Sequence, residues 1–265
     1  FHSYFSAWKT RFFLFLERIL SRKCHLIVIS PHQKKEIETY LNNPPSLSLI
    51  PLGLPLKSLS QTPLTLTLRK ELNIEKSALL IGWVGRLAPI KNIFMFLNVA
   101  KTVHSLHKEV HFIIIGDGNM RAQVQEWIDR EGLQQKIHIL GFRSDLPNIY
   151  HSLDIVTLTS LNEGTPVSLL EACACSKPVV ATRVGGIEDI ISHGETGYLA
   201  NGDDEESFSN SLLKLIQNPS KRHQMGRNGQ KRTLQHYDIN RLLQDLHTYY
   251  DNLLLRTDSQ TSTIF

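Results

Sequence analysis

Residues 154–172, DIVTLTSLNEGTPVSLLEA, decide the fold class that we predict for this chain. The stretch begins with a short apolar run, which is typical of a buried strand. It then passes through a polar turn into a helical pattern, which Thr165 is placed to cap with Pro166 at the first helical position. A strand that leads directly into a helix is the repeating unit of an α/β domain.

Apolar runs of the same kind recur on both sides of this stretch. Most are rich in Val and Ile and continuously hydrophobic, as expected of strands buried on both faces of a parallel sheet. They occupy residues 78–85, 110–118, 136–141 and 177–186. Because helical patterns lie between them, we predict a doubly wound, Rossmann-like parallel sheet, which binds its ligands at the carboxyl ends of its strands.

The sequence outside this region differs in texture. Residues 1–58 supply only two predicted strands, so we expect the end of an incomplete Rossmann-like N-terminal domain, in a chain that starts partway into a longer protein. The Pro-, Ser- and Thr-rich stretch 56–67 is typical of a linker. The further segments that we predict are a linker and first helix at 59–77, a ligand-binding domain at 78–238, a C-terminal helix at 239–256 and a frayed tail at 257–265.

Composition limits the classes of function. The 265 residues are 41% hydrophobic and 20% charged, which suits a folded chain with a sizeable core. A net charge of +4 is far below that of a protein that coats nucleic acid, so we expect no nucleic-acid partner. Three cysteines form neither a disulfide framework nor a zinc-ligand pattern, which favours reduced thiols in a cytoplasmic protein. No apolar run is long enough to span a bilayer.

Two carboxylates flank the predicted helix start. Glu163 lies in the turn before the helix and Glu171 lies on the helix. The free N–H groups and the dipole of a helix start favour an anion such as phosphate. Carboxylates beside such an anion make sense if the ligand also carries sugar hydroxyls, which donate hydrogen bonds. The alternative is that both are solvated acids of an early helical turn, which the dipole also favours.

A basic pair follows another predicted strand. In GRLAPIKN (85–92), Arg86 and Lys91 flank a turn from which both side chains can reach one anion. An ordinary surface pair is the alternative, and the segment is no P-loop because GxxxxGK[ST] is absent.

Further glycine-bearing turns follow the other strands. GDGNM (116–120) resembles an incomplete dinucleotide fingerprint and is otherwise a chain reversal. In GFRSDL (141–146), Phe142 or the backbone around Arg143 is placed to contact a base, although Phe142 is equally suited to packing. We interpret the glycines of VGGIED (184–189) as structural.

Taken in order, these motifs resemble the donor-binding half of the group 1 retaining glycosyltransferases (family GT4, GT-B fold) over about residues 78–240. The resemblance implies that Glu163 contacts the donor sugar near the reacting carbon and that Glu171 binds the ribose hydroxyls. It implies that Arg86 and Lys91 hold the diphosphate. The remaining donor-binding positions that it implies are Gly85, Gly141, Phe142, Arg143, Gly164, Thr165, Pro166 and Val167.

The resemblance also implies a mechanism and partners. Sugar would pass from a nucleoside-diphosphate sugar to a glycan or lipid-linked acceptor with retention, and the leaving phosphate would help to take the acceptor's proton. Arg86, Lys91 and the helix start would stabilise the leaving group. No DxD motif occurs, so we expect neither a metal nor another cofactor. UDP is the commonest nucleotide of the family and GDP its main competitor.

The flanks fit the same family. Residues 17–37 and 48–56 resemble the end of its N-terminal domain, which supplies the acceptor pocket, and residues 239–255 resemble the final helix that crosses back to it. Because most of that domain is missing, we expect the chain alone to be inactive. The alternatives are a nucleotide-sugar-binding fragment without activity, a sugar-nucleotide 2-epimerase of the same fold and, more distantly, a dinucleotide-dependent oxidoreductase.

Aromatic and basic side chains alternate near the start of the chain. Residues 1–20 hold seven of the 21 aromatic residues, interleaved with Lys9, Arg11 and Arg18 and followed by Lys23. One hypothesis is peripheral docking on an anionic membrane, at its inner face. The other is packing against the rest of the N-terminal domain. Both predict an exposed apolar patch on this segment.

Overall fold

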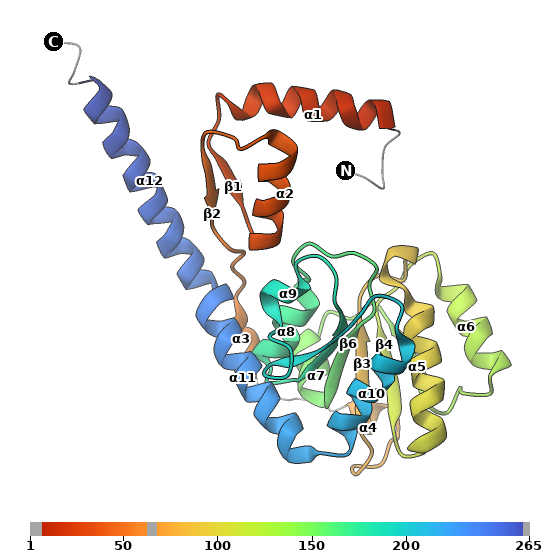
Figure 1. The fold of residues 1–265 in the computed structure, drawn as a ribbon. Coiled ribbons are helices and arrows are strands. Elements are labelled where there is room, and N and C mark those ends of the chain that lie inside the picture. The colour runs from red at the N-terminus through yellow and green to blue at the C-terminus, as the bar shows by residue number, and fades with distance from the viewer. Residues whose placement is uncertain (1–6, 63–67, 262–265) are drawn as a thin grey trace. The chain divides into compact units, whose positions relative to one another are not determined.

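The computed structural model describes residues 7–62 and 68–261 and divides the chain into two compact units (Figure 1). The larger unit is Pro55–Asp238, and the smaller one combines Phe1–Leu54 with Ile239–Phe265.

The larger unit is built on one parallel sheet. Its strands are β3 (Leu80–Val84), β4 (His111–Ile115), β5 (Ile137–Gly141), β6 (Ile155–Leu158), β7 (Val179–Thr182) and β8 (Gly197–Ala200). Their order across the sheet is β5-β4-β3-β6-β7-β8, and every pair is parallel. This is the order of a Rossmann-like sheet, which confirms the predicted α/β fold class.

Helices cover both faces of this sheet (Figure 1). One group is α5 (Ile93–Leu106), α6 (Arg121–Arg130) and α10 (Glu205–Ile216), in which α5 packs against the other two. The other group is α3 (Leu56–Gln61), α8 (Val167–Ala174) and α11 (Pro219–Tyr237), which contact one another. The shorter elements are α4 (Leu68–Glu71), the 3₁₀ turn η1 (Pro89–Lys91), α7 (Leu146–Ser152) and α9 (Ile187–Ile190).

The core of the larger unit explains why the apolar runs form strands. Trp83, Phe96, Phe112 and Phe208 are fully buried, and the rings of Phe96 and Phe112 meet edge-on at 6.0 Å. All four residues of β6 and all four of β7 are buried. A strand buried on both faces needs apolar side chains at every position, which is the continuous pattern seen in the sequence.

Three local predictions differ from the structure. Residues 56–61 form helix α3 rather than a linker, because Leu56 is buried after Pro55 and α3 packs on α8. The rest of that predicted linker, residues 63–67, lies outside the described residues. Strand β8 was not predicted, since its Gly and Tyr give it little apolar character. The last helix continues to Thr261, past its predicted end at residue 256, while residues 262–265 of the predicted tail lie outside the described residues.

The described residues of the smaller unit form a two-stranded parallel sheet and three helices. Its elements are α1 (Ala7–Ser21), β1 (Leu26–Val28), α2 (Pro31–Leu41), β2 (Leu47–Leu49) and α12 (Ile239–Thr261). Ser30 caps α2, because its side-chain oxygen accepts a hydrogen bond from the N–H of Gln33. Arg241 of α12 donates to the carbonyl oxygens of Pro51 and Leu52, each at 2.7 Å. Within residues 7–62 and 68–261, we find no helix that is both long and apolar enough to cross a membrane.

Candidate functional site

The strand order reverses between β3 and β6, the two central strands of the sheet. From β3 the chain proceeds through β4 to β5 on one side, and from β6 through β7 to β8 on the other. The loops that leave the carboxyl ends of β3 and β6 lie at this reversal point, which is where doubly wound sheets bind ligands. These two loops carry Arg86, Lys91 and Glu163.

The two loops are fastened together beneath the site. The N–H of Leu161 donates to the carbonyl oxygen of Ile90 at 2.9 Å. The Thr159 hydroxyl lies 3.1 Å from the carbonyl oxygen of Lys91 and accepts a hydrogen bond from the Trp83 indole at 3.2 Å. Since Trp83 and Thr159 are fully buried, the backbone that carries Lys91 is anchored to the core of the sheet.

Lys91 and Glu163 form an ion pair across the two loops. Glu163 Oε1 also accepts a hydrogen bond from the Ser160 hydroxyl at 2.6 Å. The side chain of Glu163 is only 10% exposed and that of Lys91 is 23% exposed. The structure thus brings two predicted site residues into direct contact. The sequence had placed them in the loops after two different strands and gave no reason to expect this contact.

A glycine pair after β7 supports the loop of Glu163. The N–H of Gly186 donates to the carbonyl oxygen of Glu163 at 3.1 Å. A Cβ at Gly185 would lie 1.9 Å from that same oxygen, and Gly185 has a left-handed φ of +52°. A Cβ at Gly186 would lie 1.9 Å from the carbonyl oxygen of Gly164. Only glycine therefore fits here, and the pair fixes the backbone that presents Glu163.

Helix α8 begins one residue later than the sequence predicted. Its first residue is Val167 and its N-cap is Pro166, whose ψ of 108° is extended rather than helical. The predicted cap residue, Thr165, makes no capping hydrogen bond, and its buried hydroxyl has no hydrogen-bond partner in the described structure. Residues 164–166 still lie in the connection from β6 to α8, and Val167 begins the helix.

Glu171 is held by a partner from another helix. The hydroxyl of Tyr150, a fully buried residue of α7, donates to Glu171 Oε2 at 2.8 Å. Burial raises the pKa of the Glu171 carboxyl, and the hydrogen bond from Tyr150 works in the opposite direction. Burial and the neighbouring Glu171 carboxylate also raise the pKa of Tyr150. The sequence offered no signal for this contact, because Tyr150 lies in a helix that it did not predict.

A largely apolar cavity opens beside the carboxyl ends of β3, β4 and β5. Its volume is about 440 Å³ and its walls include Gly85, Arg86, Ile115, Gly116, Phe142 and Arg143. At the edge of the cavity, the carbonyl oxygen of Gly141 accepts a hydrogen bond from the N–H of Gly116. Gly141 has a left-handed φ of +69°, which turns the chain there. The cavity therefore gathers four of the predicted site residues, two from the loop after β3 and two from the loop after β5.

The arginines at this cavity differ in what they can do. Arg86 is exposed and forms no ion pair with any residue in the described part of the chain. The guanidinium of Arg143 binds the carboxylates of Glu71 and Asp145, which raise its pKa. Phe142 is 82% exposed. Arg86 and the ring of Phe142 are thus available to a ligand, while Arg143 offers its backbone.

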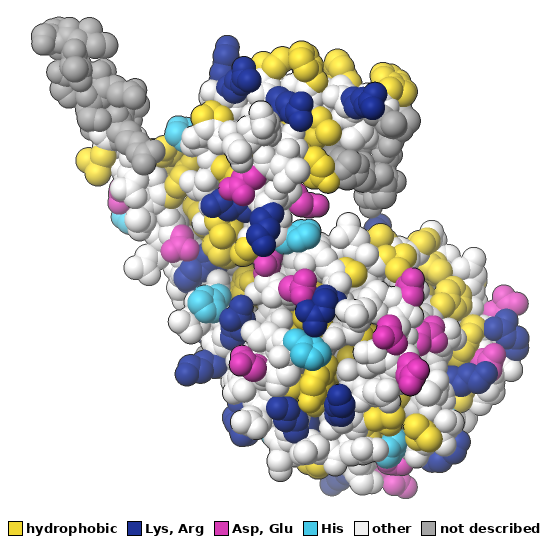
Figure 2. All heavy atoms as spheres, viewed as in Figure 1, with side chains coloured by type: hydrophobic (Ala, Val, Ile, Leu, Met, Phe, Trp, Pro, Cys, Tyr) yellow, Lys and Arg dark blue, Asp and Glu magenta, His cyan; other side chains and the backbone are white. Residues whose placement is uncertain are grey.

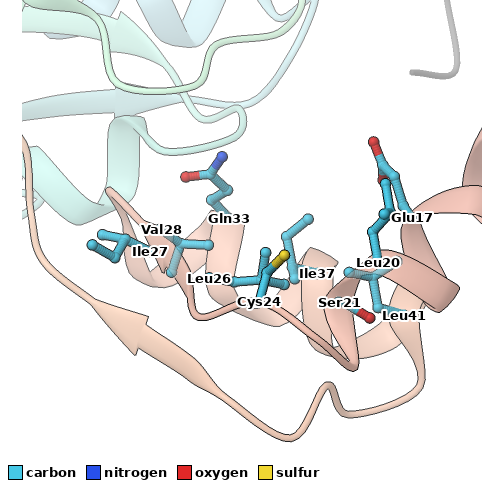
Figure 3. A pocket seen from close by; sticks show the side chains of 10 residues that line it. All are labelled: Glu17, Leu20, Ser21, Cys24, Leu26, Ile27, Val28, Gln33, Ile37 and Leu41. Atoms are coloured by element: carbon cyan, nitrogen blue, oxygen red, sulfur yellow. The ribbon is translucent and has the colours of Figure 1, made fainter. Parts of the chain in front are cut away.

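A second cavity lies in the smaller unit, between α1, β1 and α2 (Figure 3). Its volume is about 290 Å³ and most of its lining is apolar, with Leu20, Leu26, Val28 and Ile37 among the side chains that face it. None of the predicted donor-binding residues lies on its wall. No cluster of three or more His, Cys, Asp or Glu suited to a metal ion occurs in residues 7–62 and 68–261.

Known proteins share this sequence pattern and fold. Residues 65–232 match the family described as "Glycosyl transferases group 1". Over 205 residues the chain is 30% identical to the UDP-Gal:alpha-D-GlcNAc-diphosphoundecaprenol alpha-1,3-galactosyltransferase of Escherichia coli, covering 74% of this chain and 53% of that protein. It is 25% identical over 193 residues to the N-acetyl-alpha-D-glucosaminyl L-malate synthase of Bacillus anthracis, covering 72% and 50%. The chain thus spans about half the length of these relatives.

The fold also matches solved structures. Anabaena HepE in complex with UDP-glucose superposes with a TM-score of 0.81 over 90% of this chain and 67% of that one. The two sequences are 23% identical, so this likeness establishes the shared fold, which is that of the GT-B glycosyltransferases.

Proposed function

Because this chain belongs to the group 1 glycosyltransferases, we propose that its larger unit binds the nucleoside-diphosphate sugar from which a sugar is transferred. The observation that carries the proposal is the ion pair of Lys91 and Glu163 at the point where the strand order reverses, with Arg86 on the same loop as Lys91. The Escherichia coli relative is named for UDP-galactose, and HepE was solved with UDP-glucose. UDP is therefore the nucleotide that we propose, with GDP as the competitor.

The diphosphate would lie between the loops of β3 and β6. Arg86 is an exposed cation without an ion pair among the described residues, and a guanidinium can bind two phosphate oxygens at once. Lys91 lies further along the same loop, with its charge held against Glu163. The start of α8 adds the partial positive charge of a helix N-terminus. These groups supply positive charge where the leaving diphosphate becomes more negative, so no metal ion is needed in the reaction that we propose.

The base would enter the cavity beside Phe142. Val84, Ile115 and Leu146 give this cavity an apolar wall, and the exposed ring of Phe142 lies at its side. A planar base stacks well against such a ring, and backbone groups near Arg143 can bind its polar edge. Because Arg143 is tied to Glu71 and Asp145, we assign its side chain the role of fixing this loop.

The chemistry that we propose is transfer with retention of anomeric configuration. The bond from the anomeric carbon to the diphosphate oxygen breaks, and the acceptor oxygen bonds to that carbon on the same face. The acceptor's proton passes to the leaving phosphate, so no protein base is required. Glu163, fixed by Lys91 and Ser160, would orient the sugar and stabilise positive charge at its anomeric carbon. The anomeric configuration of the product, read from its proton coupling constants, tests retention.

We propose a glycan or lipid-linked acceptor and peripheral association with the inner face of a membrane. Helix α1 exposes Trp8, Phe12, Phe15 and Leu20, and Figure 2 shows apolar and basic side chains side by side over it. Exposed aromatic rings among basic residues suit the surface of an anionic membrane. The first six of the aromatic-rich residues lie outside the described part of the chain.

Flotation of the protein with vesicles tests this docking. Binding to vesicles that contain phosphatidylglycerol, lost on Trp8→Ala and Phe12→Ala substitution, would support it. Vesicles of phosphatidylcholine alone are the control for charge. Absence of binding to anionic vesicles would leave packing against a further part of the protein as the role of α1.

Calorimetric titration of the chain with UDP, GDP, ADP and NAD tests the donor site. We expect selective binding of UDP or GDP that weakens in Arg86→Ala. Arg227→Ala, which removes an exposed arginine of α11, is the matched control and should bind normally. Preferential binding of NAD would favour an oxidoreductase instead. Conversion of a nucleotide sugar to its epimer without any acceptor would favour an epimerase.

A further inference from the structure

Tyr150 donates its hydroxyl to one oxygen of Glu171 and leaves the other oxygen open. The contact is 2.8 Å and joins the phenol to Oε2. Oε1 accepts no hydrogen bond from any residue of the described chain, and it is not among the buried polar atoms that lack a partner. One carboxylate oxygen is therefore fixed by the protein while the other remains accessible.

The setting of Tyr150 makes this an unusual use of a tyrosine. The side chain is fully buried, and a phenylalanine would fill the same space without having to satisfy a hydroxyl. Its hydroxyl meets a carboxylate, and such a charge-assisted hydrogen bond is stronger and more directional than a neutral one. Tyr150 and Glu171 come from α7 and α8, so the bond ties the orientation of a half-buried carboxylate to a rigid side chain of the core.

We propose that Tyr150 is a positioning residue that makes the donor site selective for ribose over deoxyribose. The inference rests on the proposed function and, within it, on our proposal that Glu171 binds the ribose hydroxyls of the nucleotide. A carboxylate that is free to rotate can accept from whichever hydroxyl is present. When Tyr150 holds Oε2, the Glu171 carboxylate presents Oε1 in a single orientation. A sugar that lacks the matching hydroxyl then leaves Oε1 without a hydrogen bond. Sites built around a polar partner reject analogues that lack it in this way.

Calorimetric titration with UDP, 2′-deoxy-UDP and 3′-deoxy-UDP tests the role of Tyr150. For the unaltered chain we expect UDP to bind about tenfold to a hundredfold more tightly than at least one deoxy analogue, as for a lost hydrogen bond to a charged group. In Tyr150→Phe this preference should fall towards one, because UDP binds more weakly while the deoxy analogue binds as before. Tyr237→Phe is the matched control, since Tyr237 is also buried and donates to a backbone oxygen, that of Asp189.

The outcomes separate this inference from the function on which it rests. An unaltered chain that binds none of the nucleotides overturns the proposed donor site and the inference with it. UDP binding with no ribose preference, or an unchanged preference in Tyr150→Phe, overturns the inference alone. Circular dichroism verifies that each variant folds. Should Tyr150→Phe not fold, Tyr150→Met, which also lacks the hydroxyl, provides the same comparison of analogues.

Discussion

Lys91 and Glu163 form one ion pair, but removing Lys91 should destabilise the fold more than removing Glu163. Glu163 is 10% exposed, and its carboxylate has Lys91 and the Ser160 hydroxyl as partners. Lys91 is 23% exposed and ends in a flexible stem. If Lys91 is replaced by Met, the carboxylate stays buried without its cation. If Glu163 is replaced by Gln, the ammonium can turn towards water and the amide can still accept from Ser160.

The exposed fractions of Lys91 and Glu163 set how much folding free energy each substitution should cost. Breaking a buried ion pair by removing one partner costs about 3–5 kcal/mol of folding free energy. Because Lys91 and Glu163 are not completely buried and Ser160 remains, we expect about 2–3 kcal/mol for Lys91→Met. Glu163→Gln should cost about 1 kcal/mol, the size of one net hydrogen bond. The double substitution should cost less than Lys91→Met alone, because it removes the unpaired carboxylate together with the cation.

Urea unfolding of the four proteins at pH 7, followed by circular dichroism, measures these free energies. Equal dependence on urea concentration in all four would verify that the same structure unfolds. A larger loss of folding free energy in Glu163→Gln than in Lys91→Met would contradict this prediction. Additive effects of the two substitutions would also refute it, since they would show that the two side chains do not act as a pair in the folded protein.

Three further predictions concern the same unit. Burial and then Lys136 lower the pKa of His111 from 6.5 to about 4, so the folded state keeps this ring neutral while the unfolded chain takes up a proton below pH 6.5. The contribution of His111 to the free energy of unfolding should therefore be fully present above pH 6.5 and be lost as the pH falls towards 4. We expect a loss of about 1–2 kcal/mol, because solvent around the half-buried ring reduces the effect. In His111→Gln, the free energy of unfolding measured with urea should depend less on pH over this range. Gly185→Ala should cost at least about 1 kcal/mol of folding free energy from its left-handed backbone alone. In a protein that also carries an acceptor-binding domain, it should weaken sugar transfer more than UDP binding because it displaces Glu163, and normal transfer would contradict this. Thr159→Val should destabilise the fold by about 1–3 kcal/mol in the same unfolding assay, because it leaves the buried indole N–H of Trp83 unpaired, and a neutral effect would contradict this.

The periodic parts of the fold could be predicted from the sequence. Strands β3 to β7 have apolar runs because both faces of the sheet are covered. Helix α3 was missed because its serines and flanking prolines are typical of a loop, and packing on α8 outweighs that local preference. Thr165 looked like a helix cap because of its type, whereas the extended backbone of Pro166 moves the helix start beyond it.

The candidate site was predictable in position but not in its contacts. Parallel strands carry their following loops to one edge, so Arg86, Lys91 and Glu163 could be expected near one another. The partners of two other site residues could not be expected, because the tertiary fold brings Tyr150 to Glu171 and Glu71 to Arg143, and no local pattern marks these contacts. The same holds for Gly185, whose close approach to Glu163 depends on the neighbouring strand.

A crystal structure of this chain with UDP bound would test the central claim most directly. We expect the diphosphate between Arg86 and Lys91, the uracil in the cavity beside Phe142 and the ribose hydroxyls on Glu171 Oε1. A nucleotide bound elsewhere, or one whose diphosphate contacts neither Arg86 nor Lys91, would contradict it.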